Sequence, residues 1–192
     1  YRLVTYLWTF IQLGFVLWAF YVISNKPLAF YEWIGFVVST GLVTGGIGIT
    51  VAHELGHKKS TLERFYSRLL LMTVCYMHFY IEHNRGHHVY VATPLDPATA
   101  RKNENFYAFW VRSVFNSYVH AWTLESERLS RLGKPTLSLA NAMISYTALP
   151  FIFCGILTFL FSLNFGVFIW QIPVFFFAQS IVAFTLLELV NY

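Results

Sequence analysis

The chain has 192 residues, of which 57% are hydrophobic and only 11% are charged, with a formal net charge of +4. Soluble domains carry about 25% charged residues, so this composition cannot cover a water-facing surface and indicates a membrane protein. Of the 13 Lys and Arg residues, 11 lie between Lys58 and Lys134. Nucleic-acid binding is not expected, because acidic residues are mixed with these cations and apolar segments flank them.

Four apolar segments predict membrane-spanning helices, at about residues 3–25, 30–52, 137–161 and 166–189. Each is long enough to cross a hydrocarbon core of about 30 Å at about 1.5 Å per residue. The region between the second and third segments, residues 53–134, holds most of the Lys and Arg and is predicted to be cytoplasmic. We therefore predict an all-α polytopic membrane helix bundle that forms a single integral-membrane domain over residues 1–192.

Two further helices are expected within the polar region. Residues 61–81 are predicted to form an interfacial or re-entrant helix, because the apolar stretch is short. A full crossing there would also separate His57 from His83 by about 30 Å, which is incompatible with a shared metal site. Residues 105–132 are predicted to form an amphipathic helix, which ends at the breakers Gly133-Lys134-Pro135.

Five of the seven histidines fall in two short clusters. The segment His53-Glu54-Leu55-Gly56-His57 places two histidines at positions i and i+4, on one face of a helix. The segment Glu82-His83-Asn84-Arg85-Gly86-His87-His88 repeats this pair and adds an adjacent histidine. An all-imidazole site suits Fe, Zn, Cu or Ni and excludes Mg and Ca. Five ligands exceed the four of a closed zinc site, so the spacing leaves open two metal ions or a further ligand cluster.

Other side chains are placed to support these ligands, either by accepting a second imidazole N–H or by balancing the metal charge. The candidates for this role are Glu54, His78, Glu82 and Asp96. The first cluster also fits the HExxH motif of zinc proteases, which leaves the second cluster unexplained. A metal transporter would need ligands at membrane mid-depth, whereas these lie at helix ends beside charges.

The two clusters, together with the run Val89–Ala98 that follows them, resemble the bacterial membrane-bound alkane 1-monooxygenases, or alkane hydroxylases. Asn191-Tyr192 coincides with the start of the NYxEHYG segment of that family. The resemblance implies six membrane helices in the inner membrane and two non-haem irons held by histidines at the cytoplasmic side. It further implies hydroxylation of the terminal carbon of an alkane with O2, with electrons from NADH through a reductase and rubredoxin. Carried over position by position, the implied iron ligands are His53, His57, His83, His87 and His88.

The resemblance also implies that the 192 residues are truncated at both ends, show about four of six spans and are inactive alone. A histidine-box fatty-acid desaturase or hydroxylase is the close alternative. An apolar channel would select the substrate by shape, and its candidate lining residues are Trp8, Trp18, Trp33, Phe36 and Phe184. The sequence leaves open the alkane chain length, the regioselectivity and whether the protein is a homo-oligomer.

Overall fold

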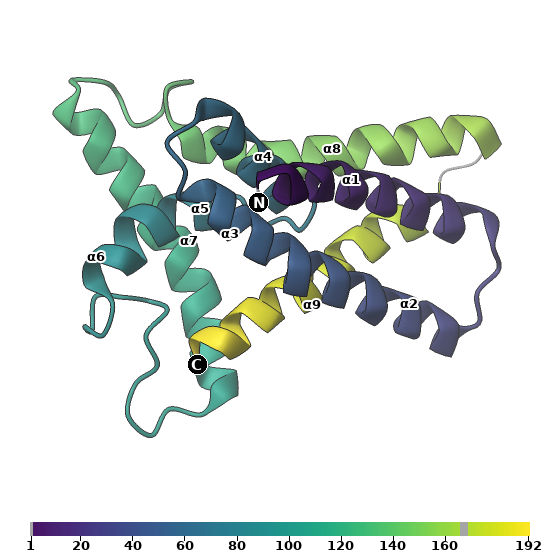
Figure 1. Cartoon of the computed structure of the whole chain (residues 1–192), viewed down its shortest axis with the longest axis horizontal. Helices are drawn as coiled ribbons and strands as arrows, with labels where there is room; N and C mark the ends of the chain where they lie inside the picture. The colour runs from purple at the N-terminus through teal and green to yellow at the C-terminus, as the bar shows by residue number, and fades with distance from the viewer. Residues whose placement is uncertain (1, 166–168) are drawn as a thin grey trace.

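The computed structural model describes residues 2–165 and 169–192, and every regular element in that part of the chain is a helix (Figure 1). Within these described ranges, four helical segments are long and apolar enough to cross a membrane. They are α1 (Arg2–Asn25), the continuous segment Phe30–Gly56, α8 (Ala142–Phe165) and α9 (Gln171–Asn191). The predicted all-α membrane bundle is confirmed, and the chain is a multi-pass membrane protein.

Polar contacts mark the position at which the apolar helix α8 begins. This helix begins at Ala142 rather than near residue 137, because Glu125 accepts the backbone N–H of Ala142 at 3.0 Å and the Asn141 side chain accepts that of Met143 at 2.9 Å. These bonds satisfy donors at the helix start that have no partner within the helix. The start expected for the fourth span, residue 166, lies outside the described residues, and α9 begins at Gln171.

The second span consists of three helical pieces, α2 (Phe30–Val43), the π-helix η1 (Thr44–Ile49) and α3 (Thr50–Gly56). Its glycines let α9 pack closely: a Cβ atom on Gly45 would lie 2.5 Å from the carbonyl oxygen of Ala183, and one on Gly41 would lie 2.5 Å from Cβ of Val182. A π-turn within an α-helix is often found at functional sites, and this one directly precedes the helix that carries His53.

The segment between the two histidine clusters folds as a hairpin. It enters as α4 (Thr61–Met72), leaves helical geometry at Thr73 and returns as α5 (Phe79–Glu82). The tip is held inside the bundle, because the Gln12 side chain donates to the Thr73 hydroxyl at 2.8 Å and that of Gln179 donates to the Thr73 carbonyl at 3.0 Å. The single helix expected over residues 61–81 is therefore two helices, and the segment re-enters the bundle without crossing it.

The remaining elements complete the polar end of the molecule. They are the π-helix η2 (His83–His87), α6 (His88–Tyr90) and the long helix α7 (Phe106–Arg131), whose first turn is capped by the Asn105 side chain. The chain ends beside the start of α7, where the Tyr192 hydroxyl donates to the carbonyl of Glu104 at 2.7 Å. Figure 1 shows α5, α6 and α7 gathered at one end, opposite the link between α1 and α2.

Candidate metal centre

The first histidine pair lies at the end of the second span. His53 is in α3 and His57 is the residue that follows its last turn, so the two are one helical turn apart on the same face. Their Nε2 atoms are 3.0 Å apart. Two nitrogen ligands at about 2.1 Å from one ion lie about 3 Å apart, so this pair has the spacing of two ligands of a single metal.

The second pair depends on the π-helix η2. In this geometry the backbone N–H of His88 donates to the carbonyl of His83, five residues earlier, so these two residues lie above one another. Their Nε2 atoms are 2.9 Å apart. In a regular α-helix, His87 would lie one turn after His83. The extra residue in this turn brings His88 into that position.

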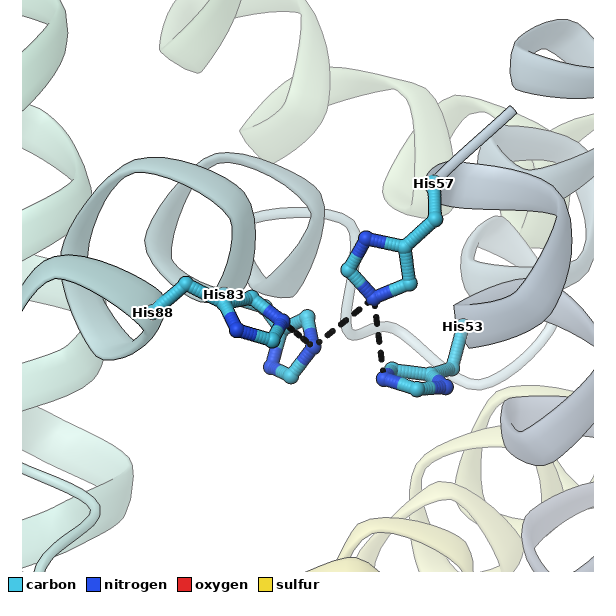
Figure 2. Close-up of side chains that lie close together, drawn as sticks. All are labelled: His53, His57, His83 and His88. Carbon is cyan, nitrogen blue, oxygen red and sulfur yellow. Dashed lines mark hydrogen bonds between the residues drawn. The ribbon is translucent and has the colours of Figure 1, made fainter. Parts of the chain in front are cut away.

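The two pairs converge, as Figure 2 shows, with the rings of His53 and His57 at the end of the second span facing those of His83 and His88. The Nε2 atoms of His57 and His83 are 3.3 Å apart. One ring nitrogen from each of His53, His57, His83 and His88 lies within 4.8 Å of the others. This four-histidine group can hold a metal ion, and its all-imidazole donor set fits iron, zinc, copper or nickel.

The environment keeps these imidazoles in the form that binds metal. Burial and, to a smaller extent, the neighbouring histidines together lower the pKa of His83 to about 2. Burial and the nearby His88 also lower the pKa of His57 below its usual value. Neutral imidazole is the ligand, so both groups are ready to coordinate a cation at neutral pH without first losing a proton.

His87 lies beside the four-histidine group but is oriented by a different partner. Its Nδ1 is 2.9 Å from the Asp96 carboxylate, which is buried and also accepts the backbone N–H of Ala98 and the hydroxyl of Thr99. A histidine that donates its Nδ1–H to a carboxylate keeps Nε2 as the nitrogen free for a metal. The predicted supporting residue Asp96 thus contacts a predicted ligand directly.

Two glutamates next to the clusters have partners other than the ligand rings. Glu54 is exposed and pairs with Lys58 at 2.9 Å. Glu82 is buried, and its carboxylate lies 3.3 Å from Nδ1 of His120. Gly86 provides the room for this contact, since a Cβ there would lie 2.7 Å from the Glu82 oxygen. Glu82 therefore ties the second cluster to α7 instead of contacting a predicted ligand.

His78 is buried next to the four-histidine group. Burial lowers its pKa to about 3, and its Nε2 has no hydrogen-bond partner among the described residues. It borders a hollow of about 10 Å³, enough for about one water molecule. The same hollow is lined by Glu82, His83, His87 and Glu188, so His78 is within reach of the second cluster.

Two further polar residues near the site, Glu188 and Arg112, were not among the predicted ligands or supporting residues. Glu188 is buried at the end of α9, where it accepts hydrogen bonds from Tyr76 at 2.9 Å and from Ser113 at 2.6 Å. An acid inside an apolar span was the sequence signal for such a role. Arg112 makes two bonds to the Glu104 carboxylate and also donates to the carbonyls of Pro97 and Thr99, which fixes the loop that carries Asp96.

An apolar cavity of about 390 Å³ opens against the histidines. His53 and His83 form its polar edge, η1 and α9 form its apolar walls, and Phe79 lines it from α5. The wall residues are Gly45, Gly46, Ile49, Thr50, Leu186, Leu187, Val190 and Asn191.

The aromatic residues proposed to line a substrate channel do not border this cavity. Trp18 packs on Phe36, and Phe184 stacks on Tyr76 at a centroid distance of 4.8 Å. Trp8 donates to the Gln12 side chain at 2.9 Å. Trp33 packs against the core between α1 and α9. These five aromatic side chains therefore pack between helices. Glycines and aliphatic side chains, together with Phe79, border the space next to the four-histidine group.

Histidines gathered at one end of a bundle of membrane-spanning helices, beside an apolar cavity, define a membrane metalloprotein. Residues 31–192 match the model of the fatty acid desaturase family, so the chain belongs to that family.

Within the family the chain is similar to proteins named alkane 1-monooxygenase. It is 42% identical over 184 residues to alkane 1-monooxygenase 2 of Pseudomonas aeruginosa, covering 94% of this chain and 46% of the relative. It is 37% identical to the alkane 1-monooxygenase of Ectopseudomonas oleovorans over 84% of this chain and 40% of the relative. A more distant relative is the xylene/toluene monooxygenase hydroxylase component XylM of Pseudomonas putida, 31% identical over 66% of this chain and 34% of the relative. The chain thus spans less than half the length of these curated relatives.

Proposed function

We propose that this chain is part of a non-haem di-iron monooxygenase that hydroxylates the terminal carbon of alkanes with O2. The observation that carries the proposal is the contact between the four-histidine group and the apolar cavity of about 390 Å³. The names of the relatives, alkane 1-monooxygenases and a xylene/toluene monooxygenase component, support an apolar substrate and an oxygenation reaction.

The cavity has the apolar lining expected of a binding site for a hydrocarbon. Its walls from η1 and α9 are mainly apolar, and polar ring nitrogens occur at the histidine edge. A substrate without a polar group can be selected only by the shape and length of such a space. The hydrocarbon chain would lie along η1 and α9, with one end directed towards His53 and His83. The walls also exclude water from the reacting end.

The proposed cofactor is a pair of iron ions. His53, His57, His83, His87 and His88 would hold them, together with further histidines supplied by the whole protein. When bound and reduced, the irons would supply the O2 activation that protein side chains cannot perform. Asp96 would fix the ring of His87, and the buried network of Glu82 and His120 would hold the second cluster against α7.

The proposed electron donors are rubredoxin and its NADH-dependent reductase. The proposed location is the bacterial inner membrane, with the metal site on the cytoplasmic side. The concentration of Lys and Arg between Lys58 and Lys134 supports this orientation. The same positive charge would attract an acidic electron carrier to the face that holds the histidines.

The test uses the full-length protein that contains this chain, reconstituted with rubredoxin, its reductase and NADH. We expect octane to give 1-octanol with O2 consumption, and His57→Ala to abolish it. Desaturation of a supplied acyl chain with no octanol would favour the desaturase alternative suggested by the family match. Metal flux across vesicles without O2 consumption would instead favour a transporter and overturn the proposal.

A further inference from the structure

A second large cavity lies away from the histidines, between α4 and the first turns of α8. It has a volume of about 390 Å³ and is lined mainly by apolar side chains, among them Leu69 and Met72 of α4 and Leu149 of α8. Its outer edge is open: Leu139 is 97% exposed and Phe65 is 51% exposed. None of the clustered histidines borders this α4–α8 cavity, so the proposed hydroxylation does not account for it.

One cation borders the α4–α8 cavity. Arg68 is half-buried in its wall, and its guanidinium carbon lies 5.8 Å from the centre of the Tyr80 ring. Its Nε donates to the carbonyl of Arg64, one turn earlier, at 3.0 Å. Among the side chains that the structure describes, no carboxylate lies within 4.0 Å of either arginine.

The acidic residue of α4 pairs with a cation outside this cavity. Glu63 is buried and pairs with Arg2 at 3.4 Å, on the side of α4 that faces α1. The face towards α8 therefore carries positive charge without an internal counter-ion. A half-buried cation in an apolar wall is costly unless an anion compensates it, so an anionic ligand would be bound favourably.

The position of the α4–α8 cavity indicates which class of anion would bind there. Residues Leu139 to Leu149 in its wall include the start of a membrane-spanning helix, at the end of the bundle that holds the polar region. This is the depth at which lipid head groups meet acyl chains. Basic pockets between membrane helices on the cytoplasmic side commonly bind anionic lipid head groups.

We propose that the α4–α8 cavity binds an anionic phospholipid, with one acyl chain along Leu69, Met72 and Leu149 and the phosphate paired with Arg68. An alkane would fill the apolar part of the cavity but has no charged group to pair with the guanidinium of Arg68. A zwitterionic lipid would place a second cation beside Arg68. The anionic phosphodiester therefore matches both parts of the cavity, and the site is independent of the proposed hydroxylation.

The test uses the full-length protein in phosphatidylcholine nanodiscs that contain a small fraction of phosphatidylglycerol with a photoreactive acyl chain. We expect crosslinks to peptides of α4 and α8, and weaker labelling by the matching phosphatidylcholine probe. One cation near an anionic head group is worth about 1 kcal/mol, so Arg68→Gln should reduce labelling about five-fold. Arg68→Lys should keep most of it. The control Arg131→Gln, at an exposed side chain paired with Glu127, should change nothing.

A second variant separates loss of the site from loss of folding. Leu149→Trp fills the apolar part of the cavity and keeps Arg68, so it should reduce labelling while metal content and melting temperature stay unchanged. Excess inorganic phosphate should not compete with the lipid probe. Equal labelling by the two lipids, no effect of Arg68→Gln in folded protein, or displacement by phosphate would each overturn the proposal.

Discussion

The Nε2 atoms of His57 and His83 lie 3.3 Å apart, although a hairpin that enters and leaves the helix bundle separates the two residues along the chain. A simple crossing of the membrane would have placed them about 30 Å apart. The four-histidine group therefore depends on the turn of this hairpin at Thr73. Side chains of α1 and α9 hold this turn inside the bundle.

Thr73→Val should destabilise the protein. The substitution removes the hydroxyl that accepts from Gln12, and an amide left unpaired inside the bundle costs about 1–3 kcal/mol. The change should appear as a lower denaturation midpoint in detergent. Thr5→Val is the matched control, because the Thr5 hydroxyl is exposed and bonds only to the carbonyl of Arg2 in its own helix. Equal effects of the two substitutions would contradict this role of the hairpin tip.

His57→Ala should lower metal binding by more than about ten-fold, because even indirect partners of ligands contribute 10–100-fold. His57 contacts both His53 and His83, so its loss removes one ligand and one of the contacts between the two pairs. Elemental analysis of purified full-length protein after dialysis at fixed free iron measures this. His120→Ala is the comparison, since His120 contacts Glu82 and lies outside the four-histidine group. Retention of metal by His57→Ala would show that the ion binds elsewhere.

Asp96→Asn tests whether His87 is a ligand. The amide is similar in size to the carboxylate but carries no charge, so it would hold the ring of His87 less firmly. We expect about a 10–100-fold loss of metal affinity. In a double-mutant cycle with His87→Ala, the second substitution should add little to the first. Additive losses would indicate that Asp96 acts only on the loop that Arg112 fixes.

Gly46→Leu should shorten the alkanes that are accepted. Gly46 lines the cavity beside the histidines, and a Cβ built there meets no atom within 4 Å, so a larger side chain enters the cavity and not the packed core. Product chain lengths from a mixture of alkanes measure the shift. Gly35→Leu is the control, because its Cβ also meets nothing and it does not line this cavity. An unchanged product profile for Gly46→Leu would place the substrate elsewhere.

The stability of the metal-free protein should fall as the pH is lowered from about 6.5 towards 3. Burial holds the pKa of His78 at about 3, against 6.5 for a free histidine. Below pH 6.5 the unfolded chain therefore binds a proton that the folded protein does not, which favours unfolding. His57 and His83 act in the same direction. Thermal unfolding in chelator at several pH values should show a weaker pH dependence for His78→Phe than for the unsubstituted protein.

Much of the architecture follows from the order of residues. Long apolar segments form helices in a membrane, because a helix pairs its backbone N–H and C=O groups within one segment and unpaired groups are not tolerated in lipid. This determines the all-α bundle and its four spans. The His53–His57 pair also follows directly, since it lies where an ordinary α-helix places positions i and i+4 on one face. The spacing of five histidines was enough to predict a metal site.

Only the tertiary structure decided which histidines meet. The π-helix η2 selects His88 over His87, and Asp96 takes the Nδ1 of His87, because backbone hydrogen bonding changes which residues share a face. The structure likewise placed glycines and aliphatic side chains of η1 and α9, and none of the five aromatic residues predicted to line a channel, beside the four-histidine group. Such contacts depend on packing between segments far apart along the chain. Helical periodicity describes the faces of one segment, whereas the distance between two segments is decided by the glycines, hydrogen bonds and ion pairs that join them.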